Sequence, residues 1–397
     1  MKFATFVALS VVTGVFASPQ DAGTSTITIP GIGDGIQLGP IALCSNGRII
    51  RRSQCCKWFR VIPQLQTEVF NNGQCHKGTR RVLQTFFHDA IGFSPALTNA
   101  GQFGSLDGSI IAHSGIETTF IPNRALGPTI EALRSIAIRN GVSFGDILNF
   151  ANTVGLGNCP GAPKLEFLAG KSNSSQVSPP GLIPGPGNSA TTILNRMGDA
   201  GFTSDETVDL LAAHTIASQE ALNLNPASAR APFDSTPAVF DSQVFIEVLL
   251  KGTVFTTGGP GIQEVLSPLP GEFRMQSDFA LARDPRTSCR WQSNMSKFDF
   301  LDADLNLIAN THIIIGNSAL VASRFRAAVA KLSVLGFDRN TLDDCSDVVP
   351  NPRPQATNPH IPGGLTNGDL EGFCAGTPLP TFPESPGPLA TVAAALP

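Results

Sequence analysis

The sequence predicts a mostly α-helical protein built as two helical halves, with little β structure and an extended C-terminal tail. Three observations support this fold class. Apolar residues recur at three- and four-residue steps along most of the chain, and few segments alternate as strands do. Residues 176–188 (QVSPPGLIPGPGN) hold four prolines and three glycines, which is typical of a linker. After Cys345 the chain is rich in proline and glycine.

The first predicted helix starts near residue 58, where Trp58, Val61, Leu65 and Val69 lie at helical spacing. We expect further helices over about 79–90, 125–140, 143–153, 189–200, 242–250 and 275–283. Another should begin at Thr203, which has capping-box spacing to Glu206, and continue through Thr215.

The N-terminal residues 1–17 have the pattern of a secretory signal peptide. Lys2 supplies the positive charge, a short apolar run follows, and Ala17 is a small residue suited to cleavage. We expect residues 18–43 to be an N-terminal extension or propeptide, 44–183 and 184–345 to be the two halves, and 346–397 to be the tail. The protein is therefore expected to be secreted and extracellular.

Composition argues against two classes of partner. The formal net charge is −4 and only 15% of residues are charged, so no basic field is available to attract nucleic acid. No polybasic stretch suggests a membrane surface, and no apolar run after the N-terminal one reaches the roughly 18 residues that a membrane span needs.

Eight dispersed cysteines without a CxxC pair favour four disulfides over a zinc site. Spacing leaves the pairing open, although the adjacent Cys55 and Cys56 are expected to have different partners. Asn173 and Asn294 each begin an N-x-S motif and are candidate glycosylation acceptors.

Two histidines lie in apolar helical segments, one in each half. His88 follows Gln84 by four residues, on the same helix face, and Phe87 is its neighbour. His214 lies within LLAAHTIA. A single histidine in such a segment is more often an ordinary core residue. Two of them in separate halves suggest that they lie on opposite faces of a haem. One imidazole would bind the haem and the other would take part in its reaction.

Each histidine is followed directly by a residue that could bind a cation through oxygen, Asp89 or Thr215. Each half also has a second oxygen-rich segment that could bind the same ion. SLDGS covers 105–109, and DSTPAVFD covers 234–241. Calcium prefers six to eight oxygens from carboxylates, hydroxyls and carbonyls. Either segment alone is more often a turn, but the repeated pairing predicts two calcium ions, each fixing a histidine-bearing helix.

These motifs resemble the secreted fungal class II haem peroxidases of the lignin, manganese and versatile type. The resemblance runs from about Cys44 to the C-terminus. It is carried by FFHDAIGFSP, LDGSI, IETTFIPN, NCPGAP, LLAAHTIAS, PFDSTPAVFDSQ, PGEFRMQSDFALARD and DDCSDV.

The resemblance implies a role for each site residue. His88 would be the distal base, Asn123 would hydrogen-bond its other ring nitrogen, and Phe87 would lie over the haem. His214 would be the axial ligand of one haem b, Asp278 would accept its Nδ1–H, and Phe233 would pack on the proximal side. The distal calcium would take Asp89, Ser105, Asp107 and Ser109, and the proximal calcium Thr215, Asp234, Thr236, Val239 and Asp241. The implied disulfides are Cys44–Cys56, Cys55–Cys345, Cys75–Cys159 and Cys289–Cys374.

One departure from the family pattern affects the distal site. The family carries arginine four residues before the distal histidine, and this chain has Gln84. An amide donates a hydrogen bond but supplies no charge, and losing a preorganised electrostatic donor costs roughly 10²–10³ in rate. Arg81 lies on nearly the same face, where we expect it to reach a haem propionate and not to replace the missing arginine over the iron.

Two further departures concern substrate oxidation. The three acidic positions of the manganese site correspond to Lys77, Arg81 and Glu220, so we expect no Mn²⁺ site. The exposed redox-active tryptophan five residues before the axial histidine is replaced by Asp209.

About 20 residues interrupt the resemblance, roughly 298–324. This segment is either a true insertion or an error in the gene model, such as a retained intron.

The sequence thus predicts a monomeric haem peroxidase that uses H₂O₂ to oxidise phenolic or other small aromatic donors, with a relation to lignin degradation. Two rival readings stay open. One is a haem-binding homologue with impaired turnover because of Gln84. The other is a secreted calcium-stabilised scaffold without haem.

Overall fold

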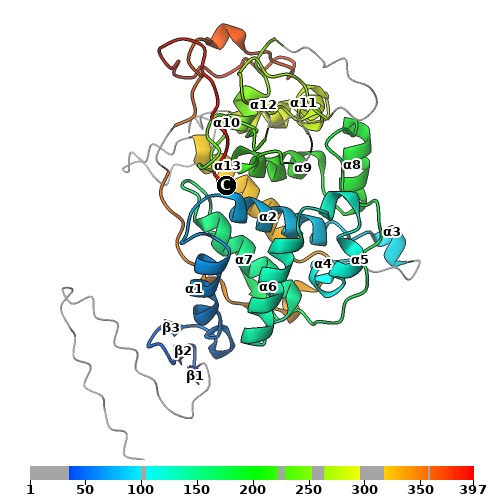
Figure 1. Ribbon diagram of the computed structural model, residues 1–397, viewed down its shortest axis with the longest axis vertical. Helices are drawn as coiled ribbons and strands as arrows, with labels where there is room; N and C mark the ends of the chain where they lie inside the picture. The colour runs from blue at the N-terminus through cyan, green and yellow to red at the C-terminus, as the bar shows by residue number, and fades with distance from the viewer. Residues whose placement is uncertain are drawn as a thin grey trace, which may run out of the picture.

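Helices dominate the computed structural model of the protein, which describes residues 35–99, 104–220, 222, 229–252, 263–295, 317–355 and 358–397 (Figure 1). The α-helices of the first half are α1 (Trp58–Glu68), α2 (Lys77–Ala90), α3 (Pro95–Thr98), α4 (Ser109–Ala112), α5 (Ser114–Glu117), α6 (Gly127–Asn140) and α7 (Phe144–Gly157). Those that follow are α8 (Ala190–Asp199), α9 (Ser204–Leu210), α10 (Gln243–Glu247), α11 (Gln276–Arg283), α12 (Ser288–Met295) and α13 (Asn317–Leu332). Short 3₁₀ helices are η1 (Ser53–Cys55), η2 (Ile121–Asn123), η3 (Leu211–Ile216), η6 (Arg339–Thr341), η7 (Ser346–Val348) and η8 (Asn367–Asp369). The mostly α-helical class is confirmed.

The helix that precedes the second histidine differs from its prediction at the C-terminal end. It starts as expected, because Thr203 and Glu206 form a capping box. The α-helix α9 ends at Leu210, however, and the chain continues as the 3₁₀ helix η3. His214 therefore lies on a tighter helical turn than the spacing suggested.

Figure 1 shows α1–α7 gathered in one half and α8–α12 in the other, with α13 running between them. Helix α2 packs on α7, and α9 packs on α13. Helix α2 lies on the side of the first half that faces α9 (Figure 1). The two segments that carry the histidines are thus brought to the junction between the halves.

The β structure of the described residues is small and partly lies where none was expected. Strands β1 (Gly35–Leu38), β2 (Ile41–Cys44) and β3 (Ile49–Ile50) form an antiparallel sheet, and β4 (Leu168–Ala169) pairs with β5 (Asp343–Asp344). Residues 35–43 of the expected N-terminal extension or propeptide (18–43) thus belong to this hairpin. Gly39, at φ +62°, makes the tight turn of the hairpin, and Ala42 is fully buried.

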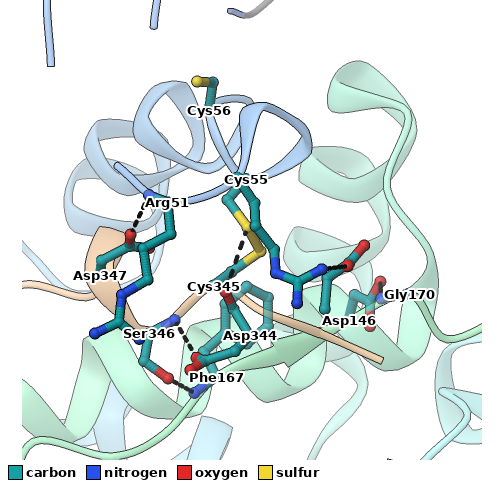
Figure 2. The surroundings of a disulfide bond; sticks show 12 residues. Arg51, Cys55, Cys56, Asp146, Phe167, Gly170, Asp344, Cys345, Ser346 and Asp347 are labelled. Atoms are coloured by element: carbon teal, nitrogen blue, oxygen red, sulfur yellow. Dashed lines mark hydrogen bonds and ion pairs between the residues drawn. A yellow bond between two sulfur atoms is a disulfide. The ribbon is translucent and has the colours of Figure 1, made fainter. Parts of the chain in front are cut away.

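Four disulfides join the pairs that the resemblance implies: Cys44–Cys56, Cys55–Cys345, Cys75–Cys159 and Cys289–Cys374. Figure 2 shows the Cys55–Cys345 bridge, with the Cys56 side chain pointing away from it as expected for adjacent cysteines. Around this bridge, the Arg51 amide donates to Asp347 Oδ2 at 2.8 Å. The bridge joins residues 290 apart in sequence, so it fixes the start of the first half to the segment after α13.

The C-terminal tail is extended, as predicted, but it does more than cover the surface. Phe382 and Ala395 are buried. The Val392 and Ala395 amides donate to Pro270 O at 2.7 Å and Arg230 O at 3.0 Å. The red segment in Figure 1 accordingly runs back towards α2.

Two predictions fall wholly or partly outside the described residues. The signal peptide (1–17) lies outside them entirely. Of the expected insertion, residues 317–324 form the first half of α13, where Val321 is buried, and the preceding part lies outside the described residues. Within the described ranges, no helix has the length and apolar character required to cross a membrane.

One predicted glycosylation acceptor is excluded. Asn294 has no exposed surface, and its Nδ2 donates to Asp209 Oδ1 at 3.2 Å, so the folded protein has no room for a glycan there. Asn173 is exposed, and the Phe144 amide occupies only its Oδ1, so this acceptor remains consistent with the structure.

Candidate active site at the junction of the two halves

Helix α2 presents two different faces. Val82 and Phe86 are fully buried on the face packed against the core. Gln84, Phe87 and His88 keep part of their surface accessible. Since residues four apart share a helix face, Gln84 and His88 lie one turn from each other.

Asn123 fixes the proton position on His88. Its Nδ2 donates to Glu117 O at 3.0 Å, so the oxygen Oδ1 must be the atom that faces His88 Nδ1, 2.8 Å away. A carbonyl oxygen only accepts, and therefore His88 Nδ1 carries the hydrogen. The Nε2 lone pair is left free, and no hydrogen bond to Nε2 is found within the described part of the chain.

The surroundings of His88 keep its imidazole neutral. Burial and, to a lesser degree, the nearby Arg81 charge lower the pKa of His88 to about 4, although the Asn123 hydrogen bond acts in the opposite direction. A neutral imidazole with a free Nε2 is able to accept a proton at any pH well above 4.

His214 has a matching arrangement on η3. Asp278, at the start of α11, accepts a hydrogen bond from His214 Nδ1 at 2.6 Å and is almost fully buried. The proton again lies on Nδ1, and Nε2 is free to bind a metal. The Phe233 ring contacts the imidazole edge to face, with ring centroids 5.4 Å apart.

The two histidine-bearing segments are joined across the junction. Glu220, six residues after His214, accepts from Arg81 Nη2 at 2.5 Å and lies 3.1 Å from Lys77 Nζ. Both cations are on α2, so α2 and the chain after η3 lie side by side at this point.

The residues present fit a haem. Both imidazoles keep a free Nε2, and both are only partly buried although they lie on interior segments. Apolar side chains of the same two segments are also partly accessible and pack on the core: Leu83, Phe87, Leu211, Ala213 and Ala217. An apolar cofactor with a metal centre would cover this surface and complete the Nε2 coordination.

The first oxygen cluster lies where α2 ends. Asp89 accepts from the amides of Gly108 (2.8 Å) and Ile110 (2.9 Å), and Ser109 Oγ lies 3.3 Å from its Oδ1. Asp107 accepts the Ser109 amide at 2.9 Å, and Ser105 lies on the same turn. The turn thereby places the oxygen-bearing residues 105–109 next to Asp89.

The second cluster lies beside η3. Thr215 Oγ1 is 2.5 Å from Asp234 Oδ2 and 3.0 Å from Asp241 Oδ1. Thr236 Oγ1 lies 3.3 Å from Oδ1 of each of these aspartates. Val239 belongs to the turn between them, and its amide donates to Thr236 O at 2.9 Å.

Both clusters have the electrostatics of a cation site. Burial raises the pKa of Asp89 and Asp234, and each has a second carboxylate nearby that raises it further, Asp107 and Asp241 respectively. Asp241 Oδ2 is buried without a hydrogen-bond partner, so one strong acceptor is unused. No three His, Cys, Asp or Glu side chains form a metal site in the described ranges, which means that an ion here would depend on hydroxyl and carbonyl oxygens as well.

Comparison with known proteins agrees with this geometry. Residues 61–297 match the family described as Peroxidase, and residues 320–397 match the fungal peroxidase extension region. A peroxidase from Arthromyces ramosus is 53% identical, over 99% of this chain and 98% of its own length. A peroxidase from Coprinopsis cinerea is 52% identical, over 98% of each chain, and a versatile peroxidase from Pleurotus eryngii is 42% identical, over 88% of this chain and 90% of its own.

The chain belongs to the fungal class II peroxidases. It is a haem enzyme that depends on hydrogen peroxide. The two family matches leave 298–319 uncovered, within the segment where the resemblance is interrupted, while residues 320–324 belong to the matched extension region.

At the positions expected to correspond to the family's manganese site, Lys77, Arg81 and Glu220 form an ion-pair cluster. Glu220 is the single carboxylate, and Arg81 and Lys77 already bind it. Sequence reasoning identified these three residues but did not foresee that they contact one another across the junction.

At the position expected to correspond to the surface tryptophan, the buried Asp209 forms an ion pair with Arg290, whose side chain is 22% exposed. Asp209 accepts from Arg290 Nε at 2.8 Å and from Nη2 at 2.6 Å. The chain's two tryptophans, Trp58 and Trp291, are both fully buried, so neither presents an oxidisable ring at the surface.

Sequence reasoning also missed carboxylates near the two clusters. Glu117 lies close enough to raise the pKa of Asp89, and Glu247 does the same for Asp234. Glu117 lies within the IETTFIPN motif, but the sequence predicted no role for it. Its burial is a tertiary property that no local pattern signals.

Proposed function

We propose that this peroxidase oxidises small phenolic and other aromatic donors at the haem edge, including phenols of the kind that lignin degradation releases. The observation that carries the proposal is the pair of fixed imidazoles. His88 is held by Asn123 at 2.8 Å and His214 by Asp278 at 2.6 Å, each with the proton on Nδ1.

His88 would act as the proton carrier for peroxide. Its free Nε2 would take the proton from one peroxide oxygen and return it to the other, and the hydrogen bond to Asn123 keeps the ring in the required tautomer. The bound haem would supply the iron that binds peroxide and the redox chemistry that draws electrons from donors. Phe87 would exclude water beside His88.

His214 would hold the haem iron through Nε2. The short hydrogen bond to Asp278 gives the imidazole anionic character, which strengthens its donation to the metal. Phe233 would fix the ring plane through its edge-to-face contact.

Two calcium ions would stabilise the segments that carry the histidines. One would bind at the end of α2 and the other beside η3, where carboxylates are buried close together and their pKa values are raised. The proposed ligands are Asp89, Ser105, Asp107 and Ser109 for the first ion, and Thr215, Asp234, Thr236, Val239 and Asp241 for the second.

Neither manganese nor bulky lignin units are proposed as direct substrates. Arg81 and Lys77 place two positive charges where Mn²⁺ would need carboxylates. Asp209 and Arg290 fill the position of the surface tryptophan.

We also propose that the protein is secreted and acts as a monomer. Four disulfides suit an oxidising extracellular compartment. The large apolar side chains exposed in the described residues lie on separate elements, such as Ile49, Ile121 and Ile138. Light scattering after size-exclusion chromatography would contradict this if it gave twice the chain mass.

One observation favours a second candidate, a haem-binding homologue with slow turnover. Gln84 is neutral where the family has a charged donor beside the distal histidine. The purified protein should first show a Soret band, which excludes the scaffold without haem. Stopped-flow mixing with H₂O₂ should then change the haem spectrum with a rate constant on the order of 10⁶ M⁻¹s⁻¹ for an efficient enzyme.

A rate constant lower by several orders of magnitude would favour the second candidate. In that case Gln84→Arg should restore rapid reaction. If Gln84→Arg stays slow as well, the defect lies elsewhere in the site.

A further inference from the structure

Arg81 contacts two polar side chains of the junction at once. Its Nη2 donates to Glu220 Oε2 at 2.5 Å, and its Nη1 donates to Gln84 Oε1 at 2.9 Å. The Arg81 and Glu220 side chains are only 12% and 17% exposed, so this chain of contacts is largely shielded from solvent. Hydrogen bonds thus connect Glu220, after η3, through Arg81 to Gln84, which lies one helical turn before His88 on α2.

The contact with Arg81 determines how the Gln84 amide is turned. A guanidinium has donors only, so the Gln84 atom that faces it must be the oxygen. The nitrogen Nε2 then remains as the free donor, and no hydrogen bond from it is found among the described residues. Because Gln84 lies one helical turn before His88 on the same face, its free N–H groups belong to the same surface as His88 Nε2.

The same contact makes the amide a stronger donor. A cation at Oε1 draws electron density through the conjugated amide, and hydrogen bonds in series strengthen one another by roughly 10–30% each. The positive charge that the family carries at position 84 is present here three residues earlier. Its effect would reach the distal site through a neutral amide.

We propose that Arg81 is a positioning residue that orients and polarises the Gln84 amide towards a ligand on the distal side of the haem, and that Glu220 holds Arg81 for this task. The inference rests on the proposed function, because it assigns that surface to the distal side. It explains how a chain without the distal arginine keeps a directed hydrogen-bond donor next to His88.

Fluoride binding to the ferric holoenzyme is the test, because bound fluoride accepts hydrogen bonds from distal donors and no turnover is needed. Arg81→Met removes both donors while keeping an unbranched apolar stem. We expect it to weaken fluoride binding by roughly tenfold, the effect of losing one hydrogen bond to a charged acceptor.

Lys77→Met is the matched control. Lys77 also contacts Glu220, at 3.1 Å, but it is half-exposed and makes no contact with Gln84. Fluoride affinity should stay within about twofold, as is usual for a surface substitution. If Arg81→Met and Lys77→Met weaken fluoride equally, or if Arg81→Met leaves it unchanged, Arg81 merely joins the two halves and the proposal is wrong.

A double-variant cycle separates positioning from loss of structure. Gln84→Leu should weaken fluoride binding at least as much as Arg81→Met, and adding Arg81→Met to Gln84→Leu should cause little further loss. Fully additive losses would contradict a path through Gln84. Thermal unfolding of the holoenzyme variants shows whether each one is folded.

The outcomes distinguish this inference from the proposed function. A protein without a Soret band overturns the proposed function. A normal Soret band with unchanged fluoride affinity in Arg81→Met overturns only the role of Arg81.

Discussion

At the scale of single residues, the tautomer of His88 depends on a side-chain amide whose orientation is fixed. Asn123 uses its nitrogen on Glu117 O and its oxygen on His88, so rotating the amide would break both hydrogen bonds. Asn123 is also 2% exposed, which prevents water from replacing either partner. The Glu117 carbonyl therefore determines the tautomer of His88 through the amide of Asn123.

Asn123→Leu should slow the reaction with H₂O₂ by roughly 10²-fold, because His88 loses the acceptor that keeps its proton on Nδ1. Stopped-flow measurement of the haem spectrum checks this. Ile121→Ala is the control, since Ile121 lies on the same 3₁₀ helix but is 77% exposed and should leave the rate unchanged. Equal rates for Asn123→Leu and the unmodified protein would show that Asn123 does not control the tautomer.

The pH dependence of the peroxide reaction should follow the lowered pKa of His88, about 4. Above this pH the imidazole is neutral and accepts a proton, and below it the imidazole is charged and does not. The rate constant should therefore be flat between about pH 5 and 7 and fall as the pH drops through 4. A fall centred near 6.5, the ordinary histidine value, would contradict a lowered pKa of His88.

At the scale of secondary-structure elements, one polar network joins α9, α12 and α13. Asp209 on α9 binds Arg290 on α12, Asn294 on α12 donates to the same carboxylate, and Arg324 on α13 donates to Asn294 Oδ1 at 2.6 Å. Arg324 belongs to the segment predicted to be inserted, yet it takes part in the packing of the helices around it.

Arg290→Met should destabilise the protein by about 3 kcal/mol, because it removes the cationic partner of the buried Asp209 carboxylate. Chemical denaturation measures this loss. Asp205→Asn removes a carboxylate that is 3.9 Å from Arg290 but 59% exposed, so it should cost less than about 0.5 kcal/mol. Similar losses in the two variants would show that burial does not determine the strength of this pair.

At the scale of the whole molecule, stability should depend on calcium and pH together. Burial raises the pKa of Asp241 to about 6, and the pKa values of Asp89 and Asp234 are raised as well. A carboxyl group with a raised folded pKa stabilises the ion-free fold at low pH, and this contribution is lost as the pH rises through about 6. Bound calcium stabilises the fold with these carboxylates ionised and so offsets the loss of stability at higher pH.

Removing calcium with a chelator should therefore lower the unfolding temperature more at pH 7 than at pH 5. Thermal unfolding with and without calcium at both pH values is the measurement. Asp241→Asn should reduce the calcium effect, whereas Glu131→Gln, which alters an exposed carboxylate, should not. An unfolding temperature independent of calcium at pH 7 would mean that these clusters are ordinary turns.

Much of this architecture was predictable from local pattern. The buried stripe of α1 and the capping box of α9 are periodic or short-range signals, and both appear in the structure. The hairpin before residue 44 was missed because its short strands lie within a Gly- and Pro-rich segment. Its stability depends on burial of Ala42 and on the Cys44–Cys56 bridge, which are tertiary features.

The sequence predicted which residues belong to the site better than it predicted which of them contact one another. Arg81 and Gln84 lie three residues apart on a helix, a spacing that favours contact between their side chains. The sequence predicted only that Arg81 reaches a haem propionate. The pairing of Glu220 with α2 was not accessible in this way. It joins residues 139 apart, and only the packing of one half on the other brings them together.

The docking of the tail also affects how this protein should be handled in the laboratory. Leu396 O accepts a hydrogen bond from the buried Arg80, which neighbours Arg81 on α2, and Ala395 is bound to Arg230 on the opposite half. An affinity tag or fluorescent fusion attached after residue 397 would begin beside the site, and any strain it exerts would be transmitted to α2. A purification handle inserted in an exposed surface loop of the first half is the safer choice for kinetic work.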